Sequence, residues 1–345
     1  MKKIGAVVFA MVLFFSTGNV LAKDEVEKSN ATDIKIHKKK VLSDEERKAL
    51  EGTKGKPTRP IDDGTFTSLA TGEIGSSLPV GGQKYALVIG LANYSGTVND
   101  LCVAAAKTAD QFPESNEGLS AYCQDSDSLH MQQALIEEYG YDEVAILRDG
   151  SATKANILAE MEKLKAKLVG GDDEVTFFFS GHGVSGKYLG IVDKEKVDEA
   201  VFTYDNQFIW DDDLKKWADS LSVYRAVFAF DICLAGGMND LAGDNRILAM
   251  SSGETESSNT YYLGGAQTDT NVFQQSEGFF SHYFVKRGMF NYEGVPDGSN
   301  LLSEGDLNKY DQKVSVEEAF SYAYPLVKIK QSPVLNDKFS NDLLL

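Results

Sequence analysis

Two apolar runs of the sequence each end in a side chain that can take part in catalysis. Residues 176–183 finish in Ser-Gly-His-Gly with His182, and residues 227–233 finish in Asp-Ile-Cys with Cys233. Continuous apolar runs are typical of buried parallel strands, and open α/β sheets place their sites just beyond the carboxyl ends of these strands. A thiol and an imidazole in such positions can serve as nucleophile and base. The sequence therefore predicts a Cys–His dyad built on two strands of one sheet.

The residues around this pair favour catalysis over a structural role. Gly183 follows the histidine, and Gly236 and Gly237 lie shortly after the cysteine. Glycines allow a substrate or a second backbone to approach closely. We expect the backbone N–H groups of Gly183 and Cys233 to face a developing oxyanion. A buried histidine is usually structural and a free cysteine is often a small hydrophobe, but an imidazole beside a thiol raises its thiolate fraction.

Strands and helices alternate along the chain and would position this dyad. Five apolar runs predict strands, and five segments with apolar residues at helical spacing predict helices. The strands cover residues 85–90, 144–147, 176–180, 227–232 and 246–250, and the helices cover residues 126–139, 153–168, 213–220, 279–287 and 316–327. This alternation predicts an α/β fold, a three-layer sandwich whose mostly parallel central sheet carries helices on both faces. Residues 251–276 are rich in Ser, Thr, Gly and Asn and are predicted to be a mobile loop.

The first 22 residues have the pattern of a secretory signal peptide. Lys2 and Lys3 precede an apolar centre at residues 4–15, and Val-Leu-Ala at residues 20–22 resembles a cleavage site. The apolar stretch is shorter than a membrane-spanning helix needs, so a membrane anchor is the weaker alternative. We expect an exported protein, periplasmic or extracellular, with no membrane span once residues 1–22 are removed.

Residues 23–82 are polar and are predicted to be a pro-segment or linker ahead of one domain at residues 83–345. One short helix is expected within this stretch, at residues 43–50, where Ser43 and Glu46 form a capping-box pattern. The basic residues Lys54, Lys56 and Arg59 also lie here and are candidate sites for activating proteolysis.

The chain is strongly acidic. Its 34 Lys and Arg against 52 Asp and Glu give a net charge of −18, which becomes −20 once the two lysines of residues 1–22 are removed. A surface with this charge disfavours nucleic acid and anionic membranes as partners and favours cationic ligands. Carboxylates are also the natural ligands of divalent metal ions.

Three cysteines are an odd number for an exported protein. Cys102 and Cys123 both lie between the first predicted strand and the next helix, and in an oxidising compartment they could close that loop as a disulfide. Cys233 would then be the unpaired, reactive thiol. Three free cysteines are the alternative, because spacing alone does not establish a bond.

Four short motifs together resemble the caspase-like cysteine peptidases of clan CD, and most closely the metacaspases. They are Tyr-Ala-Leu-Val-Ile-Gly at residues 85–90, Ser-Asp-Ser at residues 126–128, Ser-Gly-His-Gly and Asp-x-Cys, in the expected order over residues 84–290. The resemblance implies a caspase-like sandwich fold and a hydrolase of the thiol protease type, a cysteine endopeptidase acting on peptides or proteins. It also implies that Cys233 is the nucleophile and that His182 is its partner.

The resemblance further implies a pocket for a basic side chain. In metacaspases an Asp two residues before the nucleophile and a second Asp at the start of the first helix bind the substrate, and here these are Asp231 and Asp127. Two carboxylates near one cleft would hold Lys or Arg by charge-assisted hydrogen bonds. Asp127 could instead be an ordinary acid at a helix N-terminus. We expect cleavage after Arg or Lys.

Calcium-dependent metacaspases carry acids at places similar to five aspartates of this chain, and there calcium orders the active-site loops. The five are Asp193, Asp211, Asp212, Asp213 and Asp240. Hard oxygen ligands suit Ca²⁺, although residues 211–213 could simply be helix N-terminal acids on a solvated face. We expect Ca²⁺ as a cofactor and no organic cofactor. Calcium is abundant outside cells, so it could be structural there rather than a switch.

The chain departs from the metacaspase pattern beside the nucleophile, where Ile232, Leu234 and Ala235 replace Ser, His and Ser. Two alternatives to a peptidase for basic sites stay open, and this departure supports the first of them. One is a catalytically weak or inactive caspase-like protein that binds basic peptides. The other is an enzyme of the same fold that cleaves after Asn or Asp, although the acids at Asp127 and Asp231 disfavour Asp. A monomer made as a zymogen is the expected form.

Overall fold

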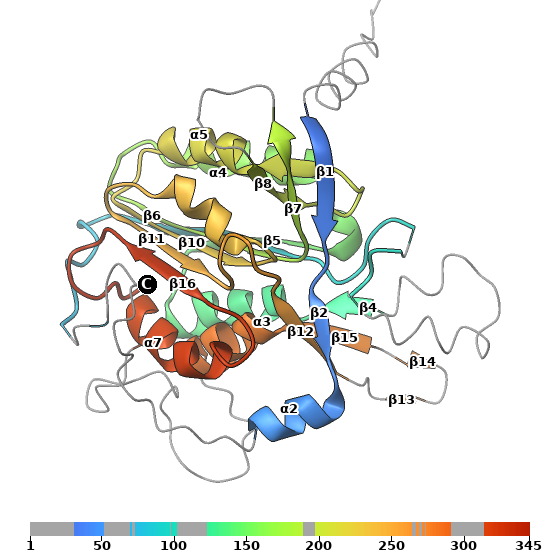
Figure 1. Ribbon diagram of the computed structural model, residues 1–345. Coiled ribbons are helices and arrows are strands. Elements are labelled where there is room, and N and C mark those ends of the chain that lie inside the picture. The colour runs from blue at the N-terminus through green and yellow to red at the C-terminus, as the bar shows by residue number, and fades with distance from the viewer. Residues whose placement is uncertain are drawn as a thin grey trace, which may run out of the picture.

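The computed structural model shows a central sheet covered by helices on both faces (Figure 1). The predicted signal peptide, Cys102, Asp193 and the basic sites within residues 54–59 lie outside the described residues. The described residues are 31–51, 70, 73–96, 98–101, 123–188, 197–263, 267–268, 271–272, 274–290 and 314–345.

The central sheet has six strands in the order β16-β11-β10-β6-β3-β5. The strand β16 pairs antiparallel at one edge, and all other neighbours run parallel. The strands are β3 (Lys84–Gly90), β5 (Glu143–Arg148), β6 (Glu174–Ser180), β10 (Arg225–Asp231), β11 (Arg246–Met250) and β16 (Val334–Asp337). The five predicted strands and the mostly parallel α/β sandwich are confirmed, and β16 is an addition that the sequence pattern did not predict.

Helices cover both faces of this sheet, and the five predicted helices are confirmed (Figure 1). On one face lie α4 (Lys154–Lys167) and α5 (Asp211–Asp219), with the short 3₁₀ helices η4 (Asp149–Ser151) and η5 (Ala235–Leu241). On the other lie α3 (Asp127–Gln133), continued by the π-helix η3 (Ala134–Glu138), α6 (Phe279–Ser281), continued by the π-helix η6 (His282–Met289), and α7 (Val316–Val327). None of the helices in the described ranges has the length and apolar character that crossing a bilayer requires.

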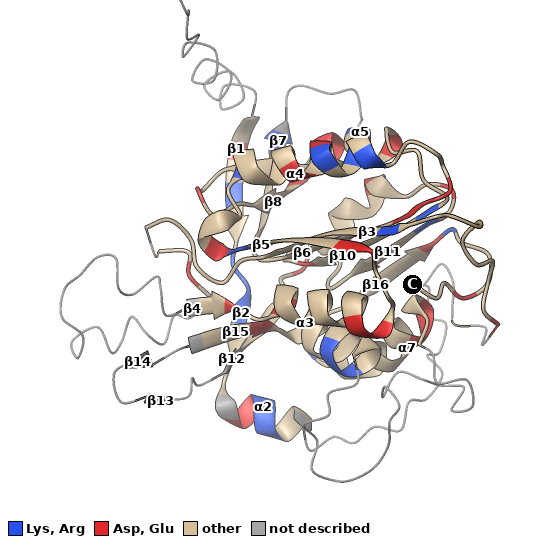
Figure 2. Cartoon of the chain, turned by 180° about the vertical axis from the view of Figure 1, so that it is seen from behind, with Lys and Arg blue, Asp and Glu red and all other residues tan. Residues whose placement is uncertain are grey.

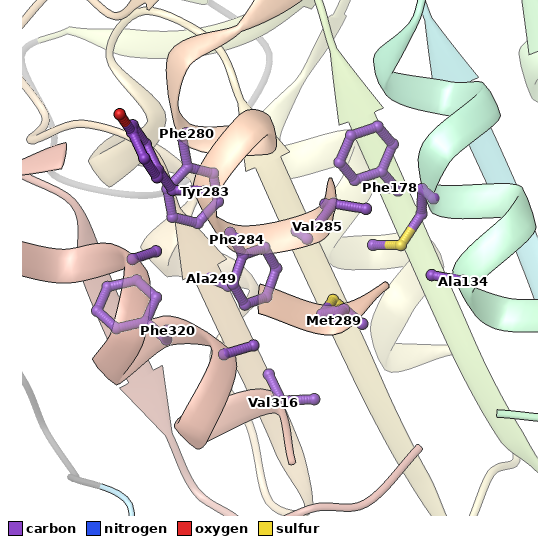
Figure 3. Close-up of a cluster of buried hydrophobic side chains, with 14 of the residues drawn as sticks. Ala134, Phe178, Ala249, Phe280, Tyr283, Phe284, Val285, Met289, Val316 and Phe320 are labelled. Atoms are coloured by element: carbon purple, nitrogen blue, oxygen red, sulfur yellow. The ribbon is translucent and has the colours of Figure 1, made fainter. Parts of the chain in front are cut away.

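Alternate side chains of the central strands point to opposite faces, because a β-strand repeats every two residues. In β6, Phe177 and Phe179 belong to the core beneath α4 and α5, whereas Phe178 belongs to the core on the other face. Figure 3 shows this second core, where Phe178 lies among side chains of α6, η6 and α7 such as Phe284 and Phe320. The continuous apolar run is therefore explained by burial on both faces.

Within the described ranges, three smaller sheets accompany the central one. The first joins β1 (Ala31–His37), β7 (Gly183–Tyr188), β8 (Asp198–Phe202) and β9 (Phe208–Trp210). The second joins β2 (Lys40–Leu42), β12 (Asn259–Leu263), β15 (Gln274–Gly278) and β4 (Cys123–Asp125), and the third is the pair β13 (Gln267–Thr268) and β14 (Asn271–Val272).

Two segments differ from the sequence prediction. Residues 251–276, predicted as a mobile loop, contain β12 and part of β15, and residues 31–42, predicted as pro-segment or linker, form β1 and β2. These strands are ordered by pairing with distant strands, β1 with β7 and β2 with β12, which a local pattern does not reveal. The predicted short helix is present as α2 (Asp44–Glu51), with the Ser43 and Glu46 capping box formed.

The strand order places a topological switch point at the carboxyl ends of β3 and β6. The chain runs from β3 to β5 on one side and then returns to form β6 on the other side of β3. Ligand sites of open α/β sheets form at such a switch point. The last residues of β3, β6 and β10, which are Gly90, Ser180 and Asp231, are aligned in register. The segments that follow these strands therefore emerge at one edge.

Candidate active site

His182 follows β6 by two residues and is held from several sides. Its backbone N–H donates to the Tyr94 hydroxyl at 2.8 Å, and the two rings stack with their centroids 4.9 Å apart. Its Nε2 donates to the Asn99 carbonyl oxygen at 2.7 Å, and its Nδ1 accepts the Lys39 backbone N–H at 3.3 Å. Because a carbonyl only accepts and an N–H only donates, these partners establish the neutral tautomer protonated on Nε2.

Cys233 follows β10 by two residues, at the start of a tight turn into η5. The next residue, Leu234, has a left-handed backbone with φ of 62°. The Cys233 thiol is fully buried and accepts the Ser258 backbone N–H, with the nitrogen 3.3 Å from sulfur. Burial raises the pKa of this thiol to about 11. The thiol is therefore protonated at neutral pH in this state.

The two strand ends meet at Gly183. A Cβ built on Gly183 would lie 2.0 Å from the Cys233 carbonyl oxygen, so only glycine fits this contact. Burial lowers the pKa of the neighbouring His182 to about 3, so its imidazole is neutral. The structure thus brings the predicted nucleophile, base and oxyanion donors together, in a covered and uncharged form.

Asp231 and Asp127, the predicted acids for a basic side chain, lie in one buried site. Gly278 stands between them, since a Cβ there would lie 2.0 Å from an Asp231 oxygen and 2.9 Å from an Asp127 oxygen. The Gly278 N–H donates to Asp127 Oδ1 at 2.9 Å, and Ser281 donates its N–H and its hydroxyl to Asp231 Oδ2, each at 2.8 Å. Burial, reinforced by the carboxylates of Asp125 and Asp231, raises the pKa of Asp127 well above its usual range.

A lysine of the N-terminal segment occupies this acid pocket, and no sequence motif predicted it. Lys39 Nζ lies 2.9 Å from Asp231 Oδ1 and 3.1 Å from Ser180 Oγ, and the side chains of Lys39 and Asp231 are fully buried. The Ser180 hydroxyl in turn donates to Asp127. Figure 2 shows basic residues on β1 and β2, the two strands that flank Lys39. The sequence does contain a run of three lysines, residues 38–40, in an acidic protein. This run does not indicate that the middle lysine, rather than either neighbour, enters the acid pocket.

Serines from the segment after β11 supply polar groups around the nucleophile. The Ser251 hydroxyl accepts the Ile232 N–H at 3.1 Å and donates to the Ile232 carbonyl at 2.9 Å. The Ser252 hydroxyl accepts the Ala235 N–H at 3.2 Å. The backbone of the apolar residues beside Cys233 is therefore satisfied from elsewhere in the chain. Sequence reasoning missed these serines because they lie in the stretch predicted as a mobile loop.

A second group of acids, three of them buried and Asp240 partly buried, lies near η5. Asp211 and Asp212 begin α5, Glu199 lies in β8 and Asp240 lies in η5. The Asp211 carboxylate accepts the backbone N–H groups of Asp212 at 2.9 Å and of Glu199 at 3.4 Å. Burial, together with the carboxylates of Asp212 and Asp240, raises the pKa of Asp211 to about 8. Three of the five predicted metal ligands therefore lie in one acidic neighbourhood, and Glu199 is a member that the sequence did not indicate.

The other predicted site residues do not join this group. Asp213 pairs with Lys216 at 3.4 Å on the exposed side of α5. Asp193 lies outside the described residues, as does the predicted disulfide, because neither Cys102 nor the Cys123 side chain is described. Within the described ranges, no group of three or more His, Cys, Asp or Glu side chains is arranged to hold a metal ion.

Residues 84–242 match the protein family described as "Metacaspase, peptidase C14 domain". Two curated relatives are Metacaspase-1 of Schizosaccharomyces pombe, 29% identical over 175 residues, and Metacaspase-1 of Meyerozyma guilliermondii, 31% identical over 144 residues. The alignments cover 46% and 39% of this chain, and 36% and 30% of the relatives, so the chain spans only part of their length. Among solved structures, the Drosophila initiator caspase Dronc aligns with 84% of this chain and 96% of its own, at 8% identity and a TM-score of 0.43.

The matched stretch contains the strand β3, the Asp127 helix entry, His182 and Cys233, in the order that the family resemblance implies. Residues 84–242 of this chain therefore resemble, in sequence and in the order of their motifs, the peptidase C14 domain of metacaspases.

Proposed function

We propose that this protein is a cysteine endopeptidase that cleaves peptides after Lys or Arg, with Cys233 as nucleophile and His182 as its acid–base partner. The observation that carries the proposal is the lysine that already sits in the acid pocket beside this pair. The Lys39 ammonium is fully buried and lies 2.9 Å from Asp231 Oδ1. A pocket that stabilises one buried ammonium in this way can recognise the basic side chain of a substrate by the same charge-assisted bonds.

Proton transfer would use His182 Nδ1. Nε2 is anchored on the Asn99 carbonyl, so Nδ1 is the nitrogen that faces the Lys39 backbone in the cleft. With a substrate in place of that segment, Cys233 gives its proton to His182, its sulfur attacks the substrate carbonyl, and the leaving amine takes the proton from His182. The N–H groups of Gly183 and Cys233 stabilise the oxyanion. Water then hydrolyses the thioester and frees the thiol.

The proposal includes export by residues 1–22 and synthesis as a zymogen. The support for a zymogen is that Lys39, ahead of the peptidase domain in the sequence, fills the acid pocket and covers the dyad. Cleavage at Lys54, Lys56 or Arg59 would detach the segment that carries Lys39 from the domain.

Fluorogenic peptides that differ only in the residue before the cut test the proposed specificity. We expect hydrolysis after Lys and Arg and none above background after Asp or Asn. An Asp side chain against Asp231 and Asp127 would bury like charges, and a neutral Asn side chain would leave these buried carboxylates without a cationic partner. The measurement is kcat/KM on the wild-type chain and on a chain with Lys39→Met. Faster hydrolysis after Asp or Asn than after Lys would contradict the proposal.

The same panel should show Lys preferred over Arg. Asp231 Oδ2 is taken by Ser281 and the Asp127 oxygens by Gly278 and Ser180, so Asp231 Oδ1 is the carboxylate oxygen that meets the ammonium. A compact ammonium can use one acceptor well, whereas a planar guanidinium is suited to two.

We propose also that Ca²⁺ binds at the acids near η5. The donor type is suitable, because Glu199, Asp211 and Asp212 are buried acids in neighbouring elements and hard carboxylate oxygens suit a hard cation. In the described residues these side chains are not arranged around one metal position, so they would have to turn toward the ion. These three residues and Asp240 would hold the ion. Bound calcium would neutralise the carboxylates and link α5 to η5, the helix that begins two residues after Cys233.

Calcium is expected to raise the melting temperature of the wild-type chain, and chelation is expected to lower it. Saturation at about 100 times the dissociation constant would add about 2.7 kcal/mol to the free energy of unfolding. Asp211→Asn should remove the response. Asp213→Asn on the same helix is the matched control, because Asp213 pairs with Lys216 at the surface and should leave the response unchanged. Calorimetry with and without chelator measures the melting temperature of both variants. An equal effect of calcium on the melting temperatures of Asp211→Asn and Asp213→Asn would contradict this site.

A further inference from the structure

We propose that residues 31–42, named here the N-terminal plug, are a built-in peptide inhibitor that fills the active-site cleft in the direction opposite to a substrate. The proposal rests on the proposed peptidase function, because it takes the acid pocket and the dyad as the substrate site. It adds the chemistry of the inhibitor, which is an extended strand bearing a lysine, and the reason why that strand is not cut.

Paired strands on both sides of Lys39 hold the plug. Ahead of Lys39, β1 pairs antiparallel with β7 down to His37 opposite Gly183, next to the dyad. After it, β2 pairs in parallel with β12, and Leu42 enters the core. Figure 1 shows β1 and β2 running in one direction from beside β7 to beside β12. The plug therefore crosses the cleft, anchored to a different sheet at each end.

The backbone nitrogens around Lys39 reveal the direction of the plug. A substrate with its basic side chain in the pocket must offer the nitrogen of the next residue to His182, because that nitrogen is the leaving group. In the plug, the nitrogen at His182 Nδ1 belongs to Lys39 itself, 3.3 Å away. The nitrogen of Lys40 instead donates to the Ser258 carbonyl at 3.0 Å. The backbone of the plug therefore passes the dyad in the direction opposite to that of a cleavable substrate.

Neither peptide bond beside Lys39 is set up for cleavage. In the peptide bond between Lys39 and Lys40, the carbonyl belongs to Lys39, whose side chain lies in the pocket. The nitrogen of this bond belongs to Lys40 and donates to the Ser258 carbonyl rather than to His182. In the peptide bond between Lys38 and Lys39, the nitrogen belongs to Lys39 and donates to His182. The side chain on the carbonyl side is that of Lys38, which is exposed and donates to the Val98 carbonyl at 2.6 Å, so it does not occupy the pocket. A strand held in this way blocks the site without being consumed.

Plug and substrate would compete for the same groups. Asp231 Oδ1 already receives Lys39 and the Ser258 hydroxyl, and His182 Nδ1 already receives the Lys39 N–H. Because the plug belongs to the same chain, its effective concentration is on the order of millimolar. Dilute peptides are therefore excluded until the plug is released.

Three variants of the full chain distinguish release of the plug from cleavage of the plug. Lys39→Met removes the buried ammonium, and Lys40→Pro removes the N–H that donates to Ser258 while keeping the Lys39–Asp231 pair. Lys40→Met is the matched control, because the side chain of Lys40 is exposed and its N–H is kept. A lysine-bearing peptide chloromethyl ketone, which alkylates the Cys233 sulfur with loss of chloride, measures access to the nucleophile by intact mass. Amide hydrogen exchange over residues 31–42 measures release without requiring activity.

We expect labelling of Cys233 at least about tenfold faster in Lys39→Met and in Lys40→Pro than in the wild type, because each loses a contact that seats the plug. Exchange over residues 31–42 should rise in both variants, and Lys40→Met should behave as the wild type. Peptide mapping of the wild-type chain should find both bonds beside Lys39 intact.

Labelling of Cys233 at equal, measurable rates in the wild type, Lys39→Met and Lys40→Pro would overturn the inhibitor assignment. A cut after Lys39 in the wild type that is absent from Cys233→Ala would reveal a forward-bound substrate and overturn the reversed direction. If Lys39→Met fails to fold because Asp231 loses its partner, the labelling rate of Lys40→Pro tests the inhibitor assignment by itself, since this variant keeps the Lys39–Asp231 pair. Faster exchange in Lys39→Met and Lys40→Pro, with no labelling and no hydrolysis of any basic peptide, would support the plug and reject the peptidase proposal.

Discussion

Replacing Cys233 with alanine is expected to abolish hydrolysis of lysyl and arginyl peptides, with a fall in kcat/KM of about 10⁴-fold or more. Cys233 is the free cysteine among the described side chains, and hydroxyls near the acid pocket already donate elsewhere, such as that of Ser258 to Asp231. The fold should be kept, because the thiol only accepts the Ser258 N–H at 3.3 Å and donates to the Ser258 carbonyl at 4.0 Å, both weak bonds, and the change costs about 1 kcal/mol. The measurement is the fluorogenic assay together with a thermal melt, in the wild-type and Lys39→Met backgrounds.

His182→Ala should cause a loss of the same order, because the imidazole handles the proton that the thiol gives up and the leaving amine receives. Residues that act as one unit show strongly non-additive effects, so the Cys233→Ala/His182→Ala chain should be no slower than either single variant. Activity that survives Cys233→Ala would reject the mechanism. Losses that multiply in the double variant would show that the two residues act independently.

Asp231→Asn is expected to lower kcat/KM for lysyl peptides by about 10²-fold, since it removes the charged partner of a buried ammonium. The same change should also destabilise the chain by up to about 3–5 kcal/mol. Ser281 donates twice to Oδ2, so the amide oxygen of the introduced side chain must take that place and its NH₂ group must face the Lys39 ammonium. Two hydrogen-bond donors, the introduced NH₂ group and the Lys39 ammonium, then face each other in a buried site without an acceptor between them.

A double-variant cycle separates these two effects. Asp231→Asn with Lys39→Met should recover much of the lost stability, because the unpaired ammonium is gone, but it should recover no activity toward lysyl peptides. Denaturant unfolding and kcat/KM are measured on the same four chains. Asp219→Asn is the matched control, since its carboxylate is half exposed and pairs with Lys215 and Arg246, where ion pairs contribute at most about 1 kcal/mol. Unchanged lysyl hydrolysis in Asp231→Asn would reject the pocket assignment.

The positions of the proposed catalytic pair at two strand ends were predictable because they depend on local pattern. Apolar runs long enough for buried strands end just before His182 and Cys233, and parallel strands bring their carboxyl ends to one edge. Asp231 was predictable for the same reason, as the last residue of β10. Asp127 needed the family resemblance, since an acid at a helix start is common for other reasons.

The groups that surround the pair were not predictable from local pattern. Lys39 and Ser180, which share a hydrogen bond, are 141 residues apart in the chain, and Lys39 sits in a polar stretch with the composition of a linker. Ser258 lies in a segment whose Ser- and Thr-rich composition indicates a loop. The order of both segments comes from strand pairing, and strand preference depends more on neighbours than on sequence.

The amino-acid sequence by itself determined the α/β framework, and it indicated the proposed nucleophile and base and the acid two residues before that nucleophile. Periodicity and burial decide these features within single elements. The tertiary structure decided which of three consecutive lysines enters the acid pocket, in which direction its strand passes the dyad, and which serines satisfy the backbone beside Cys233. These depend on pairing of β1 with β7 and of β2 with β12, and such long-range contacts exist only once the central sheet has brought distant segments together.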